Sequence, residues 1–171
     1  MDKETLMKLS IINCPDSKRF RPYVKRAAEF YAKELMTDKM LENIFIRIKF
    51  KDEIDVLGYA SIEEYNDSGK PREFEIELNG HIGGGDILRT LAHEMVHVKQ
   101  YVYGEMNESM TRWKGSKVTA GDYWNEPWEI EAYGREAGLF TNFAMKEELW
   151  NVFKGVSNPS EMIHWQDIGW K

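Results

Sequence analysis

The sequence is poor in cysteine, in long apolar runs and in positive charge. Cys14 is the only cysteine among 171 residues, so no disulfide can form within the chain, and we expect a reducing compartment. No stretch approaches the roughly 20 apolar residues that a membrane-spanning helix needs. The net charge of -6 argues against binding duplex DNA by broad neutralisation of phosphates, although a local basic patch is compatible with it.

The amino-terminal stretch MDKETLMKLSIINC lacks the features of a secretory signal peptide. It begins with charges of both signs, and Lys8 interrupts the apolar run that such a peptide needs. We therefore expect a cytoplasmic protein, or one made in the cytoplasm of a host cell. No membrane partner is expected.

The remaining composition is that of an ordinary folded protein. Apolar residues make up 42% of the chain, charged residues 30% and aromatic residues 13%. This balance is sufficient for a hydrophobic core and excludes a disordered or low-complexity chain. Because the sequence shows neither an internal repeat nor a linker, we expect one domain that spans residues 1–171.

Hydrophobic periodicity predicts both strands and helices. The segments NIFIRIKF and REFEIELN alternate apolar with polar side chains, which predicts two half-buried strands. The segment DILRTLAHEMVHVKQYVY is apolar on most of its circumference, as a buried central helix would be. The expected order is helix 17–35, strand 43–50, extended segment 56–62, strand 72–79, helix 86–103, irregular loop 104–125, helix 127–140 and helix 142–153. The predicted fold class is α+β, with a small mixed sheet of three or more strands, a buried helix and a C-terminal helical part.

The buried helix carries an HExxH pattern formed by His93, Glu94 and His97. Residues four apart on a helix point in directions about 40° apart, so both imidazoles leave the same face and could share one metal ion. Zinc accepts imidazole nitrogens at about 2.0 to 2.1 Å. Glu94 lies roughly 100° around the helix, where it is better placed to hold a water than to bind the metal.

This pattern predicts hydrolysis by a metal-activated water. Zinc lowers the pKa of a bound water to about 7, and Glu94 would act as general base and return the proton to the leaving amine. The alternative is that all three are ordinary polar residues of the helix. We consider it less favourable, because burying two histidines and a carboxylate without partners is costly.

A catalytic zinc ion also needs a third protein ligand. The stretch NEPWEIEAYGRE offers four glutamates, Glu126, Glu129, Glu131 and Glu136. We expect Glu129, because it shares a helix face with Ala132 and Tyr133 that could approach the zinc helix closely. Glu131 is the reserve candidate, since its spacing to Arg135 is typical of a solvated salt bridge. The alternative for Glu129 is an exposed first-turn glutamate favoured by the helix dipole.

An HExxH pattern followed by a glutamate in an E-x-x-A context resembles the gluzincin group of zinc metallopeptidases. The segments HEMVHVKQ and PWEIEAYGRE are similar to its SprT-like and minimal members, including phage-encoded ones. The resemblance implies a zincin-like fold, a zinc cofactor, metalloendopeptidase activity on peptide or protein substrates, and Glu129 as the ligand three residues before Ala132. Tyr133 stands where many relatives carry aspartate, so another group must orient a ligating histidine.

The resemblance also implies a place for the substrate. Strand 72–79 would form the upper edge of the cleft and bind an extended peptide as an added strand. Its three glutamates, Glu73, Glu75 and Glu77, could equally be the solvated face of an internal strand, and the sequence leaves both readings open.

Several side chains are candidates for stabilising the oxyanion. We expect Tyr133, which follows the proposed ligand by one turn and therefore joins Glu94 as a candidate catalytic residue. Tyr103, Tyr123 and His164 are rivals. His81 precedes the zinc helix and is more typical of polar surface than of a ligand.

Two questions about partners stay open. Trp113, Trp124 and Trp128, with Lys114 and Lys117, could bring the chain to nucleic acid, as the SprT-like resemblance suggests, although tryptophans that cap a core are the simpler interpretation. A second function from another class is a catalytically silent, zinc-stabilised binding or assembly module. The oligomeric state does not follow from the sequence.

Overall fold

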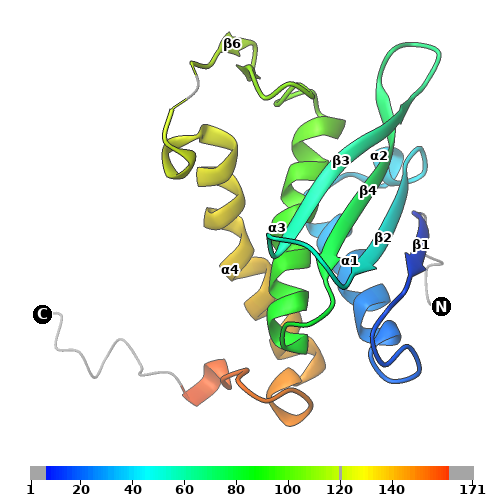
Figure 1. Cartoon of the computed structure of the whole chain (residues 1–171), viewed down its shortest axis with the longest axis vertical. Helices are drawn as coiled ribbons and strands as arrows, with labels where there is room; N and C mark the ends of the chain where they lie inside the picture. The colour runs from blue at the N-terminus through cyan, green and yellow to red at the C-terminus, as the bar shows by residue number, and fades with distance from the viewer. Residues whose placement is uncertain (1–6, 120, 162–171) are drawn as a thin grey trace, which may run out of the picture.

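A four-stranded mixed sheet and a set of helices form a mixed α+β structure, seen in a computed structural model that describes residues 7–119 and 121–161 (Figure 1). The strands and α-helices are β1 (Lys8–Ile12), α1 (Arg21–Leu35), α2 (Asp38–Leu41), β2 (Phe45–Lys51), β3 (Gly58–Tyr65), β4 (Pro71–Asn79), α3 (Gly84–Val102), β5 (Arg112–Trp113), β6 (Ser116–Lys117) and α4 (Pro127–Glu147). Short 3-10 turns are η1 (Tyr123–Asn125), η2 (Leu149–Asn151) and η3 (Pro159–Glu161). In the described ranges, no helix is both long and apolar enough to cross a bilayer.

The strand order is β1-β2-β4-β3, with β1, β2 and β4 parallel and β3 antiparallel to β4. The expectation that strand 72–79 forms an edge is therefore wrong, because β4 lies between β2 and β3. The tight turn at 66–70 connects β3 to β4, and β3 pairs with β4 on the side opposite to β2. The glutamates of β4 therefore lie on the solvated face of an internal strand, and in the described residues β1 and β3 form the two edges of the sheet.

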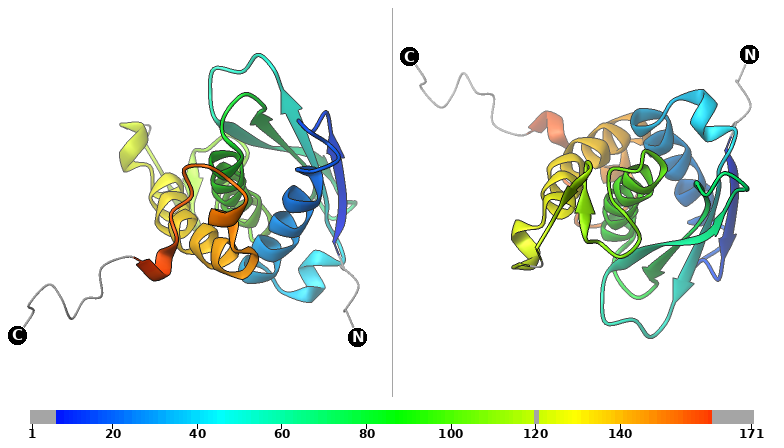
Figure 2. Two further views of the ribbon diagram at one scale, coloured as in Figure 1. Left: turned by 90° about the horizontal axis from the view of Figure 1, so that it is seen from below. Right: turned by 90° about the horizontal axis from the view of Figure 1, so that it is seen from above.

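The sheet has one buried and one solvated face, as the alternation in the sequence predicts. Ile46 and Ile48 of β2 are fully buried, and so are their neighbours on β4. The opposite face carries cross-strand ion pairs, among them Lys51 with Glu77 at 3.0 Å. The helices α1, α3 and α4 all lie on the buried side, and no helix of the described residues covers the solvated face (Figure 2).

Helix α3 lies in the middle of the molecule, between the sheet and α4 (Figure 1). Within it only Gly84, Asp86 and Arg89 are not buried, which confirms the prediction of a central apolar helix. The helix begins at Gly84 rather than at the expected Asp86. A Cβ atom at Gly85 would lie 2.5 Å from Val156, so a glycine there lets the C-terminal segment pack against the helix end.

The local structure differs from the expected one in three places. A single helix, α4, runs from Pro127 to Glu147 across the break expected between helices 127–140 and 142–153, because Phe140, Phe143 and Ala144 continue one buried stripe, and η2 follows it. The helix is followed by Glu148, whose φ of 50° is left-handed. The loop 104–125 holds the β5–β6 hairpin and η1, and β1 was not predicted at all.

Candidate metal centre

Helices α3 and α4 bring three buried side chains together at their crossing. His93 Nε2 and His97 Nε2 lie 3.1 Å apart on the same face of α3. Glu129, in the first turn of α4, places one carboxylate oxygen 3.2 Å from His93 Nε2 and the other 3.4 Å from His97 Nε2. This buried His/His/Glu group could bind a metal ion. Among the residues that the structure describes, no other histidine, cysteine or carboxylate group of this kind is found.

The charges of the group are strongly coupled. Burial lowers the pKa of His93, but hydrogen bonds to Glu129 and Glu136 outweigh it and raise the pKa to about 9. Burial raises the pKa of Glu129, yet hydrogen bonds with both imidazoles lower it to about 2.

The remaining ring nitrogens of the two histidines each have a hydrogen-bond partner. His93 Nδ1 lies 3.1 Å from Glu136 Oε2, and His97 Nδ1 lies 2.8 Å from Gln100 Oε1. Glu136 makes this contact from α4, one turn beyond Tyr133. A carboxylate or amide oxygen at Nδ1 favours the tautomer that leaves Nε2 free to bind a metal.

The orientation of the Gln100 amide is fixed from its other side. Its Nε2 donates to the backbone oxygen of Trp128 at 2.9 Å and to Glu131 at 3.0 Å, so its oxygen must face His97. Glu131 also accepts from Lys99 at 2.8 Å and from Arg135 at 3.1 Å. Glu131 therefore lies behind the group rather than in it. Its expected ion pair with Arg135 lies at the surface, and it has a second, largely buried ion pair with Lys99.

Glu94 is buried beside the same group and lines the adjoining cleft. Burial raises the pKa of its carboxyl to about 6, against the opposing charges of His97 and His93. The backbone of β3 approaches it closely at Gly58, where an added Cβ atom would lie 2.9 Å from Glu94 Oε1 and 2.7 Å from Thr90. A glycine at this position leaves the space that the carboxylate occupies.

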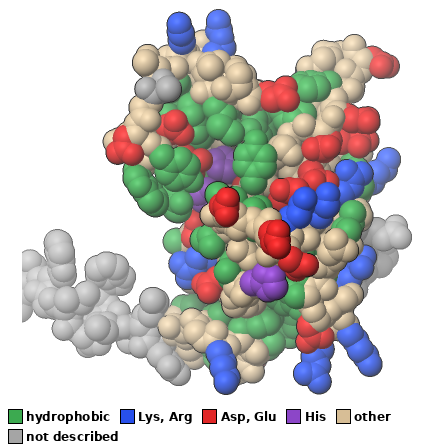
Figure 3. Space-filling model, viewed as in Figure 1, with side chains coloured by type: hydrophobic (Ala, Val, Ile, Leu, Met, Phe, Trp, Pro, Cys, Tyr) green, Lys and Arg blue, Asp and Glu red, His purple; other side chains and the backbone are tan. Residues whose placement is uncertain are grey.

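A cleft of about 710 Å³ opens onto the group. Its floor is one face of α3, and its walls come from the segment before β3 on one side and from η1 and α4 on the other. The lining residues are Asp55, Val56, Leu57, Gly58, Asn79, Ile82, Asp86, Arg89, Thr90, His93, Glu94, Tyr123, Trp124, Tyr133 and Glu136. Figure 3 shows histidine side chains recessed in a hollow with hydrophobic side chains on both sides.

Two of the candidate tyrosines lie at the group. The ring of Tyr133 packs against His93 with centroids 4.5 Å apart, and the hydroxyl of Tyr123 donates to Glu129 at 2.9 Å. Tyr103 lies at the far end of α3, next to Thr37. His81 faces Asp52 at 3.6 Å and is not part of the group. His164 lies outside the described residues.

The tryptophans of the loop have different environments. Trp128 is buried, and Trp113 packs against it edge-on at 6.5 Å, so these two belong to the core. Trp124 is exposed in the cleft. Lys114 lies over the ring of Trp113 at 4.9 Å, next to β6, which holds Lys117. Nucleic-acid association stays a prediction, which a salt-dependent mobility shift with single-stranded DNA would test.

Comparison of this chain with protein-family models, with curated proteins and with solved structures finds no match. The geometry of the site is therefore the basis for assigning a function.

Proposed function

We propose that this chain is a zinc-dependent metallopeptidase with a zincin-like fold, in which His93, His97 and Glu129 hold the metal and Glu94 is the general base. One observation carries the proposal: two imidazoles and a carboxylate converge in a buried group, and His93 of this group lines a cleft together with Glu94. Two nitrogen ligands and one carboxylate ligand form one of the ligand sets of catalytic zinc sites.

The spacing of the donor atoms is close to what zinc needs. A tetrahedral ion with bonds of 2.0 to 2.1 Å holds its ligand atoms about 3.3 to 3.4 Å apart. The two Nε2 atoms lie 3.1 Å apart, and two different oxygens of Glu129 lie 3.2 Å from His93 Nε2 and 3.4 Å from His97 Nε2. The Nδ1 partners Glu136 and Gln100 support the same assignment, because they leave both Nε2 atoms available.

The residues of the chain divide the chemical work between them. When bound, zinc supplies a Lewis acid that polarises a carbonyl group and acidifies water. Glu94 accepts a proton from a water in the cleft and returns it to the leaving amine, and its pKa of about 6 suits both transfers near neutral pH. Tyr133, exposed in the cleft beside His93, is the proposed hydrogen-bond donor to the carbonyl oxygen.

A peptide substrate is best accommodated along β3. This strand pairs with β4 on one side only within the described residues, and its first residue, Gly58, lines the cleft. An extended peptide that added to this edge would run past Glu94 and the metal group. We therefore assign to β3 the substrate-binding role that the resemblance implied for strand 72–79.

A catalytically silent, zinc-stabilised module is the rival function. A purely structural zinc site has four protein ligands and is closed to solvent. Here three ligands converge in the described part of the chain and one of them, His93, lines a cleft, which favours hydrolysis.

The test compares Glu94→Gln with the wild type. We expect about one zinc per chain in both proteins, and a fall of about 10² to 10⁴-fold in cleavage of labelled casein by the variant. A variant with unchanged turnover, or a wild-type protein that cleaves nothing with zinc bound, would contradict the proposal. Glu131→Gln is the matched control, because Glu131 lies next to the site and is not a proposed ligand; loss of zinc from this variant but not from Glu129→Gln would reverse the choice of ligand.

A further inference from the structure

We propose that the cleft selects peptides with a large apolar side chain, such as leucine or phenylalanine, beside the scissile bond, and that it disfavours acidic residues there. Trp124 and Leu57 would form the two walls that hold this side chain. The inference deepens the proposed peptidase function and rests on it for the position of the cut.

The first argument is an exposed apolar patch. Large apolar side chains that stay exposed tend to mark a binding site when they are contiguous. Five such side chains line this one cleft: Val56, Leu57, Tyr123, Trp124 and Tyr133. Trp124 is 64% exposed and Leu57 is 58% exposed, although both could have contributed to the core if they had been turned inward. A mostly apolar lining with a few polar groups is typical of a ligand pocket.

The second argument is the arrangement of the two walls. Val56 and Leu57 precede β3, while Trp124 belongs to η1 and Tyr133 to α4. Helix α3, with His93 and Glu94, lies between these elements (Figure 1). A side chain bound between the walls would therefore stand over the reacting groups.

The third argument is a continuous row of rings that leads to the metal group. The rings of Trp124 and Tyr133 are 5.2 Å apart and tilted by 36°, and Tyr133 in turn packs on His93 at 4.5 Å. Tyr123 supports Trp124 from another direction at 5.4 Å. Rings braced in this way lose little conformational entropy on binding, so they make good anchors for an apolar partner.

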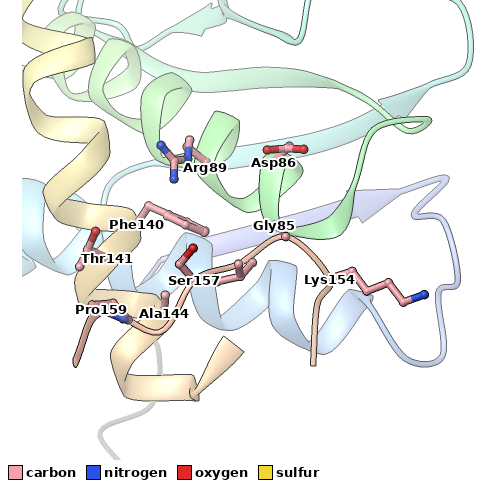
Figure 4. Close-up of a pocket in the computed structure, with 11 residues that line it drawn as sticks. Gly85, Asp86, Arg89, Phe140, Thr141, Ala144, Lys154, Ser157 and Pro159 are labelled. Carbon is pink, nitrogen blue, oxygen red and sulfur yellow. The ribbon is translucent and has the colours of Figure 1, made fainter. Parts of the chain in front are cut away.

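The fourth argument is charge. The carboxylates of Asp55, Asp86, Glu94 and Glu136 line the cleft, whereas Arg89 is the only lysine or arginine among its lining residues. The guanidinium of Arg89 lies over the ring of Phe140 at 4.8 Å, toward a smaller cavity of about 180 Å³ between α3, α4 and the segment 154–159 (Figure 4). An acidic side chain that does not reach the metal would thus meet like charges.

The experiment measures binding apart from cleavage. The Glu94→Gln variant, loaded with zinc, is titrated with fluorescently labelled eight-residue peptides that differ only at one central position, which is Phe, Leu, Ala or Asp. We expect the Phe and Leu peptides to bind at least tenfold more tightly than the Ala peptide, and the Asp peptide to bind most weakly. Equal affinities for all four peptides would overturn the inference.

Variants in the same background locate the selectivity. Trp124→Ala and Leu57→Ser should each reduce the preference of Phe over Ala to less than threefold while the zinc content is unchanged. Ile130→Ala is the matched control, because Ile130 is 58% exposed on α4 outside the cleft lining, and it should keep the full preference. Full preference in both cleft variants would contradict the inference.

These results distinguish failure of the inference from failure of the proposed function. If the wild type binds apolar peptides selectively and cleaves none of them, the peptidase proposal fails and the selectivity stands. If it cleaves all four peptides with equal efficiency, the peptidase proposal stands and the selectivity fails.

Discussion

Replacing Gln100 with methionine tests whether a residue that is not a ligand orients the metal-binding imidazole of His97. Gln100 is fully buried, and its amide contacts His97, Glu131 and the backbone oxygen of Trp128. Methionine has a similar length but neither accepts nor donates strongly. Glu131 keeps Lys99 and Arg135 as partners, so the loss falls mainly on His97.

The expected losses of stability and of zinc affinity follow from His97 Nδ1, which loses its hydrogen-bond partner. A buried donor without a partner costs about 1 to 3 kcal/mol, which should lower the free energy of unfolding of the metal-free protein by that amount. Loss of a group that orients a ligating histidine lowers metal affinity by about 10 to 100-fold, or about 1.4 to 2.8 kcal/mol. Urea unfolding in a chelator measures the first quantity, and zinc titration against a competing indicator measures the second.

Tyr31→Phe is the matched control. Tyr31 is also fully buried, and its hydroxyl donates at 3.1 Å to the backbone oxygen of Leu88, which lies in α3 like Gln100. Its loss should cost about 1 kcal/mol of stability and leave the zinc affinity unchanged. If Gln100→Met binds zinc within twofold of the wild type, Gln100 does not orient His97 and the reasoning fails.

Three further predictions concern other parts of the structure. Gly58→Ala should lower kcat at least tenfold with zinc retained, because the added Cβ atom would displace Glu94. Gly138→Ala is the control and should leave kcat unchanged, because a Cβ atom there meets nothing within 4 Å. Equal rates of the two variants in steady-state assays would contradict this prediction. Burial raises the pKa of the Cys14 thiol to about 11, so iodoacetamide at pH 8 should label it at least tenfold more slowly in the folded than in the urea-unfolded chain, as mass spectrometry can follow. Lys99→Met should cost about 3 kcal/mol in urea unfolding, because two carboxylates lose a buried partner; a loss below about 1 kcal/mol would refute it.

Local patterns predicted the elements whose burial is one-sided or complete. The alternation in β2 and β4 and the apolar circumference of α3 are properties of the segments themselves, so the sequence was sufficient for them. β1 was missed because its five residues are only half-buried and its partner, β2, lies beyond α1 and α2 in the chain.

The order of the strands could not be predicted in the same way. Nothing in the glutamates of β4 distinguishes a solvated internal strand from an exposed edge, because both need one polar face. Only the pairing of β3 on the outer side of β4 decides between them.

At the site, helical spacing was enough to align His93 with His97, since both lie on one helix. The positions of Glu136 and Gln100 at the two Nδ1 atoms were not predicted. Glu136 depends on how α4 crosses α3, which no local pattern encodes. Gln100 lies one turn beyond His97, so its spacing was a usable signal that the sequence reasoning did not use.

The most direct test of the central claim is X-ray absorption at the zinc edge of the reconstituted protein, combined with metal analysis. We expect one zinc per chain with two imidazole nitrogens and at least one oxygen at about 2.0 to 2.2 Å, and loss of the metal from His97→Ala and Glu129→Ala. A protein that binds no zinc, or that keeps the same coordination in both variants, would contradict the account.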